Sequence, residues 1–168
     1  MEQIVSQEAG QLEKDRLIQL VGFIIGKELF GVNILMVQEI IRSAPITPIP
    51  DSPVFIEGVI NLRGSIIPVI DLRKRLNLVQ DENEKRDTWI LIINIEGRVT
   101  GFIVDSVTEV LKILANEIKP PPDMVVAGLK SQYIQGVCKM GTKLLILLDF
   151  NRILMVEEIR KLKKIERN

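Results

Sequence analysis

The chain of 168 residues is 46% hydrophobic and 26% charged, which is enough to bury a core in one large domain or two small ones. Lys plus Arg and Asp plus Glu balance at 22 each, so no overall positive field exists to hold a polyanion or an acidic membrane surface. The absence of histidine excludes His-based triads and His-ligated zinc, and the single cysteine, Cys138, excludes an internal disulfide.

The first residues, MEQIVSQEAGQLEKD, are polar and show no period, so they predict a flexible N-terminal arm over residues 1–15. This stretch lacks the basic start and the apolar segment of a secretory signal. No apolar run approaches the ~20 residues that a membrane-spanning helix needs. The sequence therefore predicts a cytoplasmic protein.

Two later stretches have the pattern of β-hairpins. RLIQLVGFIIGKELFGVNI, which starts at Arg16, has two apolar runs around residues 26–28, and TWILIINIEGRVTGFIVDSV has two more around residues 96–97. Ile and Val make up a quarter of the chain, and their branched side chains suit a pleated sheet better than a helix. We expect mainly β structure, with two hairpins of one kind.

The sequence also repeats internally. FIEGVINLRGSIIPVIDL (55–72) aligns with YIQGVCKMGTKLLILLDF (133–150) without a gap at an offset of 78. FGVNILMVQEII (30–41) aligns in the same way with TGFIVDSVTEVL (100–111) at an offset of 70. Because the elements come in the same order in both halves, the sequence predicts a duplicated unit of about five short strands.

A sheet of five short strands hides its edges most easily by curling into a closed or nearly closed barrel. The predicted fold is therefore all-β, with two pseudo-equivalent five-stranded barrels over residues 16–80 and 81–150. The charged stretch VQDENEKRD (79–87) marks the predicted joint, although a terminal strand could cross from one barrel to the other.

After the second barrel the pattern changes to that of a helix. FNRILMVEEIRKLKKIERN spaces its apolar residues by three, with charged residues between them. We expect an amphipathic C-terminal helix over residues 151–168. It either covers a seam of a barrel or attaches to a membrane, and its mixed charges favour the first role.

Residues that recur in both halves have structural explanations. Asp71 and Asp149 each end a strand and precede a helical stretch, where a carboxylate can cap the first turn. An acid and base pair would require the two carboxyl groups to lie close together, which separate barrels disfavour. Positions without Cβ at bulges or corners explain the recurring glycines, which are Gly31, Gly101, Gly58 and Gly136.

Two further features also favour structural roles. Cys138 lies in an apolar run without a His partner, which is typical of a small core residue rather than a nucleophile. LRKRL (72–76) has the composition of a solvated helix face.

Arg63 is different, because the corner that carries it is not repeated. Asn-Leu-Arg-Gly (61–64) aligns with Lys-Met-Gly-Thr (139–142), so the duplicated fold does not require an arginine at this position. What both copies keep is structural, whereas what one copy alone carries is a candidate for function. Arg63 is either a solvated loop charge or an interface residue, a role in which arginine is enriched.

At this corner the sequence resembles the CheW domain family, which occurs in a bacterial chemotaxis coupling protein, in the regulatory domain of the histidine kinase CheA and in CheV. The resemblance rests on GVNILMVQEI, FIEGVINLRGSIIPVIDLR and GFIVDSVTEV, in that order, and it covers roughly residues 14–156. The length leaves no room for a receiver or kinase domain, which favours the stand-alone coupling protein.

The resemblance implies two five-stranded SH3-like barrels and a scaffold that catalyses no reaction and needs no cofactor. It implies two partners, the CheA regulatory domain and the cytoplasmic tip of methyl-accepting chemotaxis receptors, and hence a location at the inner face of the membrane. It also implies receptor- or kinase-binding roles for the residues that match the family motifs, which are Val37, Glu39, Gly58, Asn61 and Arg63.

Two other functions remain open from the residues alone. A nucleic-acid-binding pair of small barrels would use the basic runs at 73–75 and 160–164, although the zero net charge and the few aromatic residues argue against it. A hydrolase would use Asp71 and Asp149 as a carboxylate pair.

Overall fold

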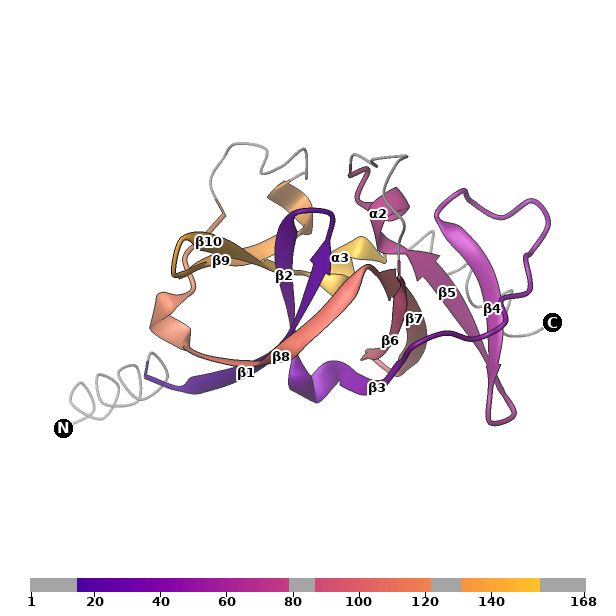
Figure 1. Cartoon of the computed structure of the whole chain (residues 1–168), viewed down its shortest axis with the longest axis horizontal. Helices are drawn as coiled ribbons and strands as arrows, with labels where there is room; N and C mark the ends of the chain where they lie inside the picture. The colour runs from indigo at the N-terminus through magenta and orange to yellow at the C-terminus, as the bar shows by residue number, and fades with distance from the viewer. Residues whose placement is uncertain (1–14, 79–86, 122–130, 155–168) are drawn as a thin grey trace, which may run out of the picture.

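The computed structural model describes residues 15–78, 87–121 and 131–154, and this part of the chain is all-β, as predicted. Its strands form two five-stranded sheets, which lie side by side in Figure 1. In spatial order, sheet A contains β8 (Ser106–Leu114), β1 (Leu17–Ile25), β2 (Glu28–Asn33), β10 (Lys143–Leu148) and β9 (Ile134–Met140). Sheet B contains β3 (Val37–Ile41), β6 (Trp89–Ile95), β7 (Arg98–Val104), β5 (Ser65–Asp71) and β4 (Ile56–Leu62).

The two sheets are interleaved along the sequence. The first repeat supplies β1 to β5 and the second supplies β6 to β10, yet each sheet combines the first hairpin of one repeat with three strands of the other. Each exchanged hairpin pairs on both sides with the other repeat, in parallel between β2 and β10 and between β5 and β7, and antiparallel between β1 and β8 and between β3 and β6. The predicted barrels cover residues 16–80 and 81–150 with at most a terminal strand crossing between them, whereas the structure exchanges a whole hairpin in each direction.

Each antiparallel hairpin has a two-residue loop. The predicted hairpins β1–β2 and β6–β7 are confirmed, with Ile25 paired to Glu28 and Ile95 paired to Arg98. The hairpins β4–β5 and β9–β10 turn in the same way. Short loops fix the strand register, so the apolar faces are set at the turns.

Each sheet closes on itself through one pair of backbone hydrogen bonds beyond its edge strand. Thr47, after β3, exchanges two N–H to O=C bonds of 2.9 Å with Val59 of β4. Lys119, after β8, does the same with Val137 of β9, at 2.8 and 2.9 Å. Each sheet therefore fits an SH3-like barrel whose edges are covered.

Glycine precedes the closing residue in both sheets, because the crossing chain passes too close for a side chain. A Cβ on Gly58, whose φ is +148°, would lie 2.1 Å from the Thr47 carbonyl oxygen. A Cβ on Gly136 would lie 2.4 Å from Cγ2 of Ile118. The prediction that these glycines occupy positions without room for Cβ is confirmed.

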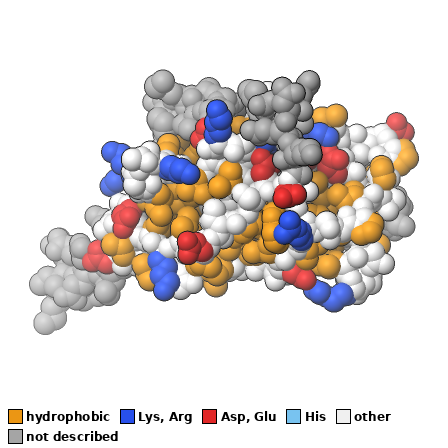
Figure 2. Space-filling view, viewed as in Figure 1, with side chains coloured by type: hydrophobic (Ala, Val, Ile, Leu, Met, Phe, Trp, Pro, Cys, Tyr) orange, Lys and Arg blue, Asp and Glu red, His pale blue; other side chains and the backbone are white. Residues whose placement is uncertain are grey.

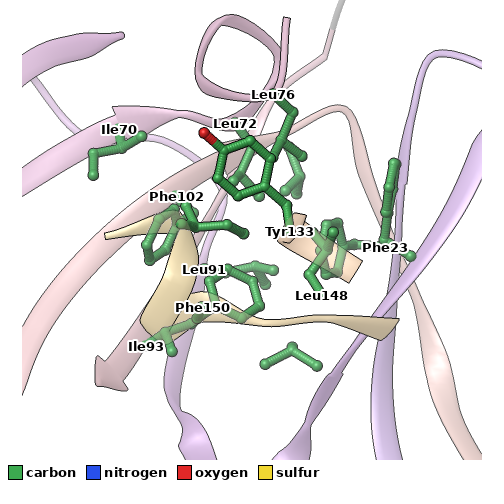
Figure 3. Close-up of a cluster of buried hydrophobic side chains, with 14 of the residues drawn as sticks. Phe23, Ile70, Leu72, Leu76, Leu91, Ile93, Phe102, Tyr133, Leu148 and Phe150 are labelled. Atoms are coloured by element: carbon green, nitrogen blue, oxygen red, sulfur yellow. The ribbon is translucent and has the colours of Figure 1, made fainter. Parts of the chain in front are cut away.

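The inner strands bury both of their faces over part of their length. Along β10, Leu145 and Leu147 point into the interior of sheet A, whereas Ile146 and Leu148 point into a larger cluster between the sheets. Continuous apolar runs are expected for strands buried on both faces. Figure 3 shows the cluster between the sheets, which we call the shared core and which includes Phe23, Ile70, Leu91, Ile93, Phe102, Tyr133, Leu148 and Phe150. The two barrels are thus one packed unit.

Short helical turns connect the strands. They are η1 (Ile34–Met36), α2 (Leu72–Arg75), η2 (Ala115–Glu117), η3 (Ser131–Tyr133) and α3 (Phe150–Ile153). Asp71 accepts a hydrogen bond from the Arg73 N–H at 3.0 Å, and Asp149 accepts one from the Arg152 N–H at 3.2 Å. The predicted caps are confirmed.

Several predictions fall wholly or partly outside the described residues. They concern the N-terminal arm except Asp15, most of the stretch at 79–87, and the C-terminal helix beyond Leu154. Within the part of the chain that is described, no helix is long and apolar enough to cross a membrane.

One local prediction is wrong. The helix face LRKRL was expected to be solvated, but the Arg73 side chain is buried, with 3% of the residue exposed. Lys74 does face solvent, and Arg75 is half-buried. Cys138, in contrast, is buried in the interior of sheet A as expected, and this burial raises the pKa of its thiol.

Candidate functional site

The β4–β5 hairpin presents Arg63 at the first position of its two-residue loop. Arg63 and Gly64 both have positive φ angles, of 51° and 89°, as in type I′ turns. The Asn61 side-chain oxygen accepts a hydrogen bond of 2.9 Å from the Gly64 N–H. Because a non-glycine residue is uncommon in the left-handed region, Arg63 needs such local support to keep its position.

The Arg63 guanidinium forms a two-pronged ion pair with Glu39 of β3. One nitrogen donates to Glu39 Oε1 at 3.1 Å, and a second donates to Oε2. Since β3 and β4 are opposite edges of sheet B, the pair links the two edges of the curled sheet. Two parallel bonds fix the plane of the guanidinium as well as its position.

The pair is open to solvent mainly on the arginine side. The Arg63 side chain is 73% exposed, whereas that of Glu39 is 28% exposed. The hydrogen bonds and charge of Arg63 lower the pKa of Glu39, and Glu39 raises the pKa of Arg63. Both groups are therefore ionised near neutral pH, and the outer face of the guanidinium remains available to another molecule.

A shallow hollow of about 450 Å³ lies beside Arg63. Its lining combines polar and aliphatic side chains, namely Gln38, Leu62, Arg63, Ser65, Ile66, Ile67, Gly97 and Val99. Ile66 is 49% exposed. The hollow could accept a small apolar side chain while Arg63 meets an acceptor at its edge.

The second wall of the hollow is the β6–β7 hairpin, which has the same turn as β4–β5. The Asn94 side-chain oxygen accepts a hydrogen bond of 2.8 Å from the Gly97 N–H, and Glu96 has a φ of 51°. The two turns therefore stand at the same end of sheet B, one with Arg63 and the other with Glu96 at the equivalent position.

The structure separates the five residues that the sequence singled out. Glu39 and Arg63 come together in one ion pair, and Asn61 holds the turn that presents Arg63. Val37 pairs with Ile93 and packs against the shared core, so most of its contacts are internal. Gly58 has its structural role at the barrel closure.

The hollow and its second wall were not predicted from the sequence. Ile66 and Val99 carry no motif of their own, so the sequence gives no signal for them. The spacing Asn-x-x-Gly, however, occurs at both 61–64 and 94–97 and could have indicated two equivalent tips.

Neither carboxylate chemistry nor a basic surface gains support from this arrangement. Asp71 and Asp149 each cap their own helix, and the described residues hold no group of three His, Cys, Asp or Glu side chains placed to bind a metal. On the face shown in Figure 2, Lys and Arg side chains are scattered among Asp and Glu side chains.

Comparison with known proteins agrees with the fold. The model of the CheW-like domain matches residues 19–158, which include nearly all of both sheets and the Arg63 corner. The chain belongs to the CheW-like domain family. The resemblance found in the sequence is therefore confirmed.

Individual relatives cover nearly the same length. "Chemotaxis protein CheW" from Treponema pallidum (strain Nichols) is 37% identical over 151 residues, which are 88% of each chain. "Chemotaxis protein CheW" from Klebsiella aerogenes is 40% identical over 82% of this chain and 81% of the relative. The crystal structure of the scaffolding protein TtCheW from Thermoanaerobacter tengcongensis has a TM-score of 0.77 at 38% identity, covering 85% of this chain and 96% of that one.

Proposed function

We propose that this chain is a chemotaxis scaffold that couples methyl-accepting chemotaxis receptors to the histidine kinase CheA without catalysing a reaction. The observation that carries the proposal is the match of the CheW-like domain over residues 19–158. Full-length relatives named as chemotaxis proteins, and a related structure titled as a scaffolding protein, support it. Such a scaffold works on the cytoplasmic side of the membrane, where receptor tips would hold it in signalling arrays.

The Arg63 corner is the contact that we assign to a partner. Its guanidinium is oriented by Glu39 before any partner arrives, so less conformational entropy is lost on binding. The adjoining hollow, with Leu62 and Ile66, offers apolar area next to this charge. This combination suits a partner segment that has an acidic or carbonyl acceptor beside an aliphatic side chain.

The other proposed site residues support this contact indirectly, by keeping Arg63 in position. Glu39 orients the guanidinium, Asn61 holds the turn, Val37 anchors β3 against the shared core, and Gly58 permits the closure of sheet B. Replacing any of them would weaken binding through the position of Arg63. The relatives described above give no support to the nucleic-acid-binding alternative.

Calorimetry with two purified partners tests the proposal. The full chain is titrated separately with a CheA regulatory domain and with a receptor-tip fragment, and circular dichroism checks the fold of every variant. We expect wild type to bind both partners and Arg63→Ala to bind at least one of them about tenfold or more weakly.

Arg42→Ala is the matched control. Arg42 is also exposed and forms an ion pair with Asp87. It directly follows the C-terminal end of β3. We expect this variant to bind as wild type does. Failure of wild type to bind either partner would overturn the scaffold function, whereas unchanged binding by a folded Arg63→Ala variant would overturn only the role of the corner.

A further inference from the structure

The short helix α2 belongs to sheet B by sequence. Its Lys74 pairs with Glu57 of sheet B, but its two arginines make their side-chain polar contacts on the side of sheet A. The helix follows β5 directly, and two leucines, Leu72 and Leu76, pack into the shared core. Its arginines, Arg73 and Arg75, reach two separate parts of sheet A and its connections. This helix is therefore a point at which the position of one barrel is defined relative to the other.

Arg73 makes the first of these contacts. Its guanidinium donates to Asp105 Oδ2 at 2.6 Å, and the same oxygen accepts the Gly26 N–H at 2.7 Å. Gly26 is at the tip of the β1–β2 hairpin, and Asp105 lies between β7 and β8, where the chain passes from sheet B to sheet A. One carboxylate thus joins α2, the crossover and the exchanged hairpin.

Arg75 makes the second contact, with η3 and α3. It donates from Nε to the carbonyl oxygen of Ile153, at the end of α3, at 2.8 Å. It also donates to the Tyr133 hydroxyl at 3.0 Å. The rings of Phe55 and Tyr133 lie over its guanidinium carbon at 4.9 and 5.0 Å from their centroids. The guanidinium is held by groups from both repeats.

These polar contacts are directional, whereas the apolar contacts of the shared core are not. Apolar burial is non-directional, so aliphatic side chains can hold two sheets together at several relative angles. Charged hydrogen bonds are directional, and they are lost when donor and acceptor rotate apart. A buried ion pair adds little net stability compared with apolar packing, but in some proteins such pairs select one arrangement of the packed parts.

We propose that Arg73 and Arg75 are positioning residues that fix the angle between the two barrels. Arg73 sets the exchanged hairpin of sheet A through Asp105, and Arg75 sets the end of α3. Under the proposed scaffold function, on which this part of the inference rests, the same two residues fix the angle at which the two partners are held. Neither residue needs to touch a partner.

Distance measurement between spin labels on the full chain tests the geometry without any partner. Labels are attached through Ser43→Cys near sheet B and Lys112→Cys on sheet A, both exposed positions. The thiol of Cys138 is buried, so only the introduced cysteines react. We expect one narrow distribution of label-to-label distances when Arg73 is present. In Arg73→Met we expect this distribution to become broader or to shift.

Matched variants separate positioning from general destabilisation. Lys74→Met alters the same helix at an exposed residue that pairs with Glu57 of sheet B, and we expect it to keep the narrow distribution. Arg73→Lys retains the charge, and we expect its distance distribution to be nearly as narrow as that of wild type.

Asp105→Asn keeps an acceptor for the Gly26 N–H but loses the charge that Arg73 pairs with. This variant replaces Arg73→Met in the test if Arg73→Met does not fold. A narrow, unshifted distribution in folded Arg73→Met or Asp105→Asn would overturn the proposal.

A second measurement connects the geometry to the scaffold. We expect Arg73→Met to bind each partner alone within about twofold of wild type, but to form the three-component assembly about tenfold less well, because simultaneous binding depends on relative orientation. Unaltered assembly by a variant with a broadened distribution would overturn the link to function. If wild type bound neither partner, the scaffold function would fail while the distance result would stand.

Discussion

Sheets A and B have the same skeleton and differ at one corner. Both close through a single backbone pair, at Thr47–Val59 in sheet B and at Lys119–Val137 in sheet A, and both have a glycine at the crossing. In both, the last strand of a repeat, β5 in sheet B and β10 in sheet A, is followed by a helix that an aspartate caps. These shared features explain how a barrel closes, and they carry no information about a partner.

The difference lies at the tip of one hairpin, β4–β5 in sheet B and the equivalent β9–β10 in sheet A. In sheet B, Arg63 stands at a positive φ and pairs with Glu39. In sheet A the corresponding residue is Gly141, also at a positive φ, and Glu109, which corresponds to Glu39, is exposed. A duplicated fold thus contains its own control, because it shows which residues the architecture can do without.

The largest expected effect comes from the core that the two sheets share. Phe102→Ala should lower the free energy of unfolding by about 3–5 kcal/mol, because Phe102 is fully buried between the sheets and contacts the ring of Phe150. Both sheets should unfold in one transition, followed by urea denaturation with circular dichroism and by hydrogen exchange. If Phe102→Ala lost protection from hydrogen exchange in one sheet alone, the two barrels would unfold independently, contrary to the expectation.

The closing glycines should differ in their sensitivity. Gly58→Ala should cost about 3 kcal/mol or more, because the new Cβ meets a backbone oxygen and φ is +148°. Gly136→Ala should cost about 1–3 kcal/mol, since its nearest neighbour is a side-chain methyl group that can partly move. Urea midpoints of both variants measure this order, and the reverse order would contradict our account of closure.

The helix caps should have smaller effects. Asp71→Ala and Asp149→Ala should each lower stability by about 1 kcal/mol, since each removes an acceptor from a first turn. Burial raises the pKa of Asp71, so the folded state holds this proton more tightly than the unfolded chain. The stability contributed by Asp71 should therefore fall as pH rises from the ordinary Asp range through the raised pKa.

Asp71→Asn isolates this pH effect, because the amide oxygen keeps the cap and cannot titrate. The difference in unfolding free energy between wild type and Asp71→Asn, measured from acidic to neutral pH, should show the predicted downward slope. A slope of opposite sign would contradict the assignment of burial as the dominant cause.

The smallest effect on stability is expected at the exposed ion pair. Glu39→Gln should leave the urea midpoint near that of wild type, yet weaken partner binding, since Arg63 loses its orientation. Arg63 lowers the pKa of Glu39, so the contribution of the pair is present above the ordinary Glu pKa and is lost as pH falls through the lowered value. Glu109→Gln is the control in sheet A, and equal loss of binding by both variants would remove the distinction between the corners.

The repeat was readable from the sequence because equivalent positions obey the same local rules. Gly58 with Gly136, and Asp71 with Asp149, follow from backbone geometry and capping, which depend on near neighbours. The exchange of hairpins was not readable, because the pairing of Leu29 with Leu145 joins positions far apart, and a similar apolar strand in the same repeat would satisfy the same pattern.

The site was predictable only in part for the same reason. Arg63 stood out because its repeat partner is glycine, and Glu39 belongs to a family motif, but nothing in the sequence joins the two side chains. Arg73 was misjudged because charged residues on a short helix are usually solvated, whereas its acceptor Asp105 lies on a connection that the exchange brings beside it.

The exchanged hairpin also has a consequence for synthesis on the ribosome. The β1–β2 hairpin, with the stacked rings of Phe23 and Phe30, emerges early, but its neighbour β10 begins only at Lys143. At about 5–20 residues per second, this leaves the hairpin without that neighbour for on the order of ten seconds. Sheet B has all of its strands once Val104 has emerged, but the shared core lacks Leu148 and Phe150 until the end of the chain follows. In nascent chains stalled shortly beyond Val104 we therefore expect neither sheet to resist proteases, and resistance of β3–β7 at that length would contradict a single packed unit. Translation thus supplies the strands of one barrel while the first hairpin of the other still waits for its neighbour.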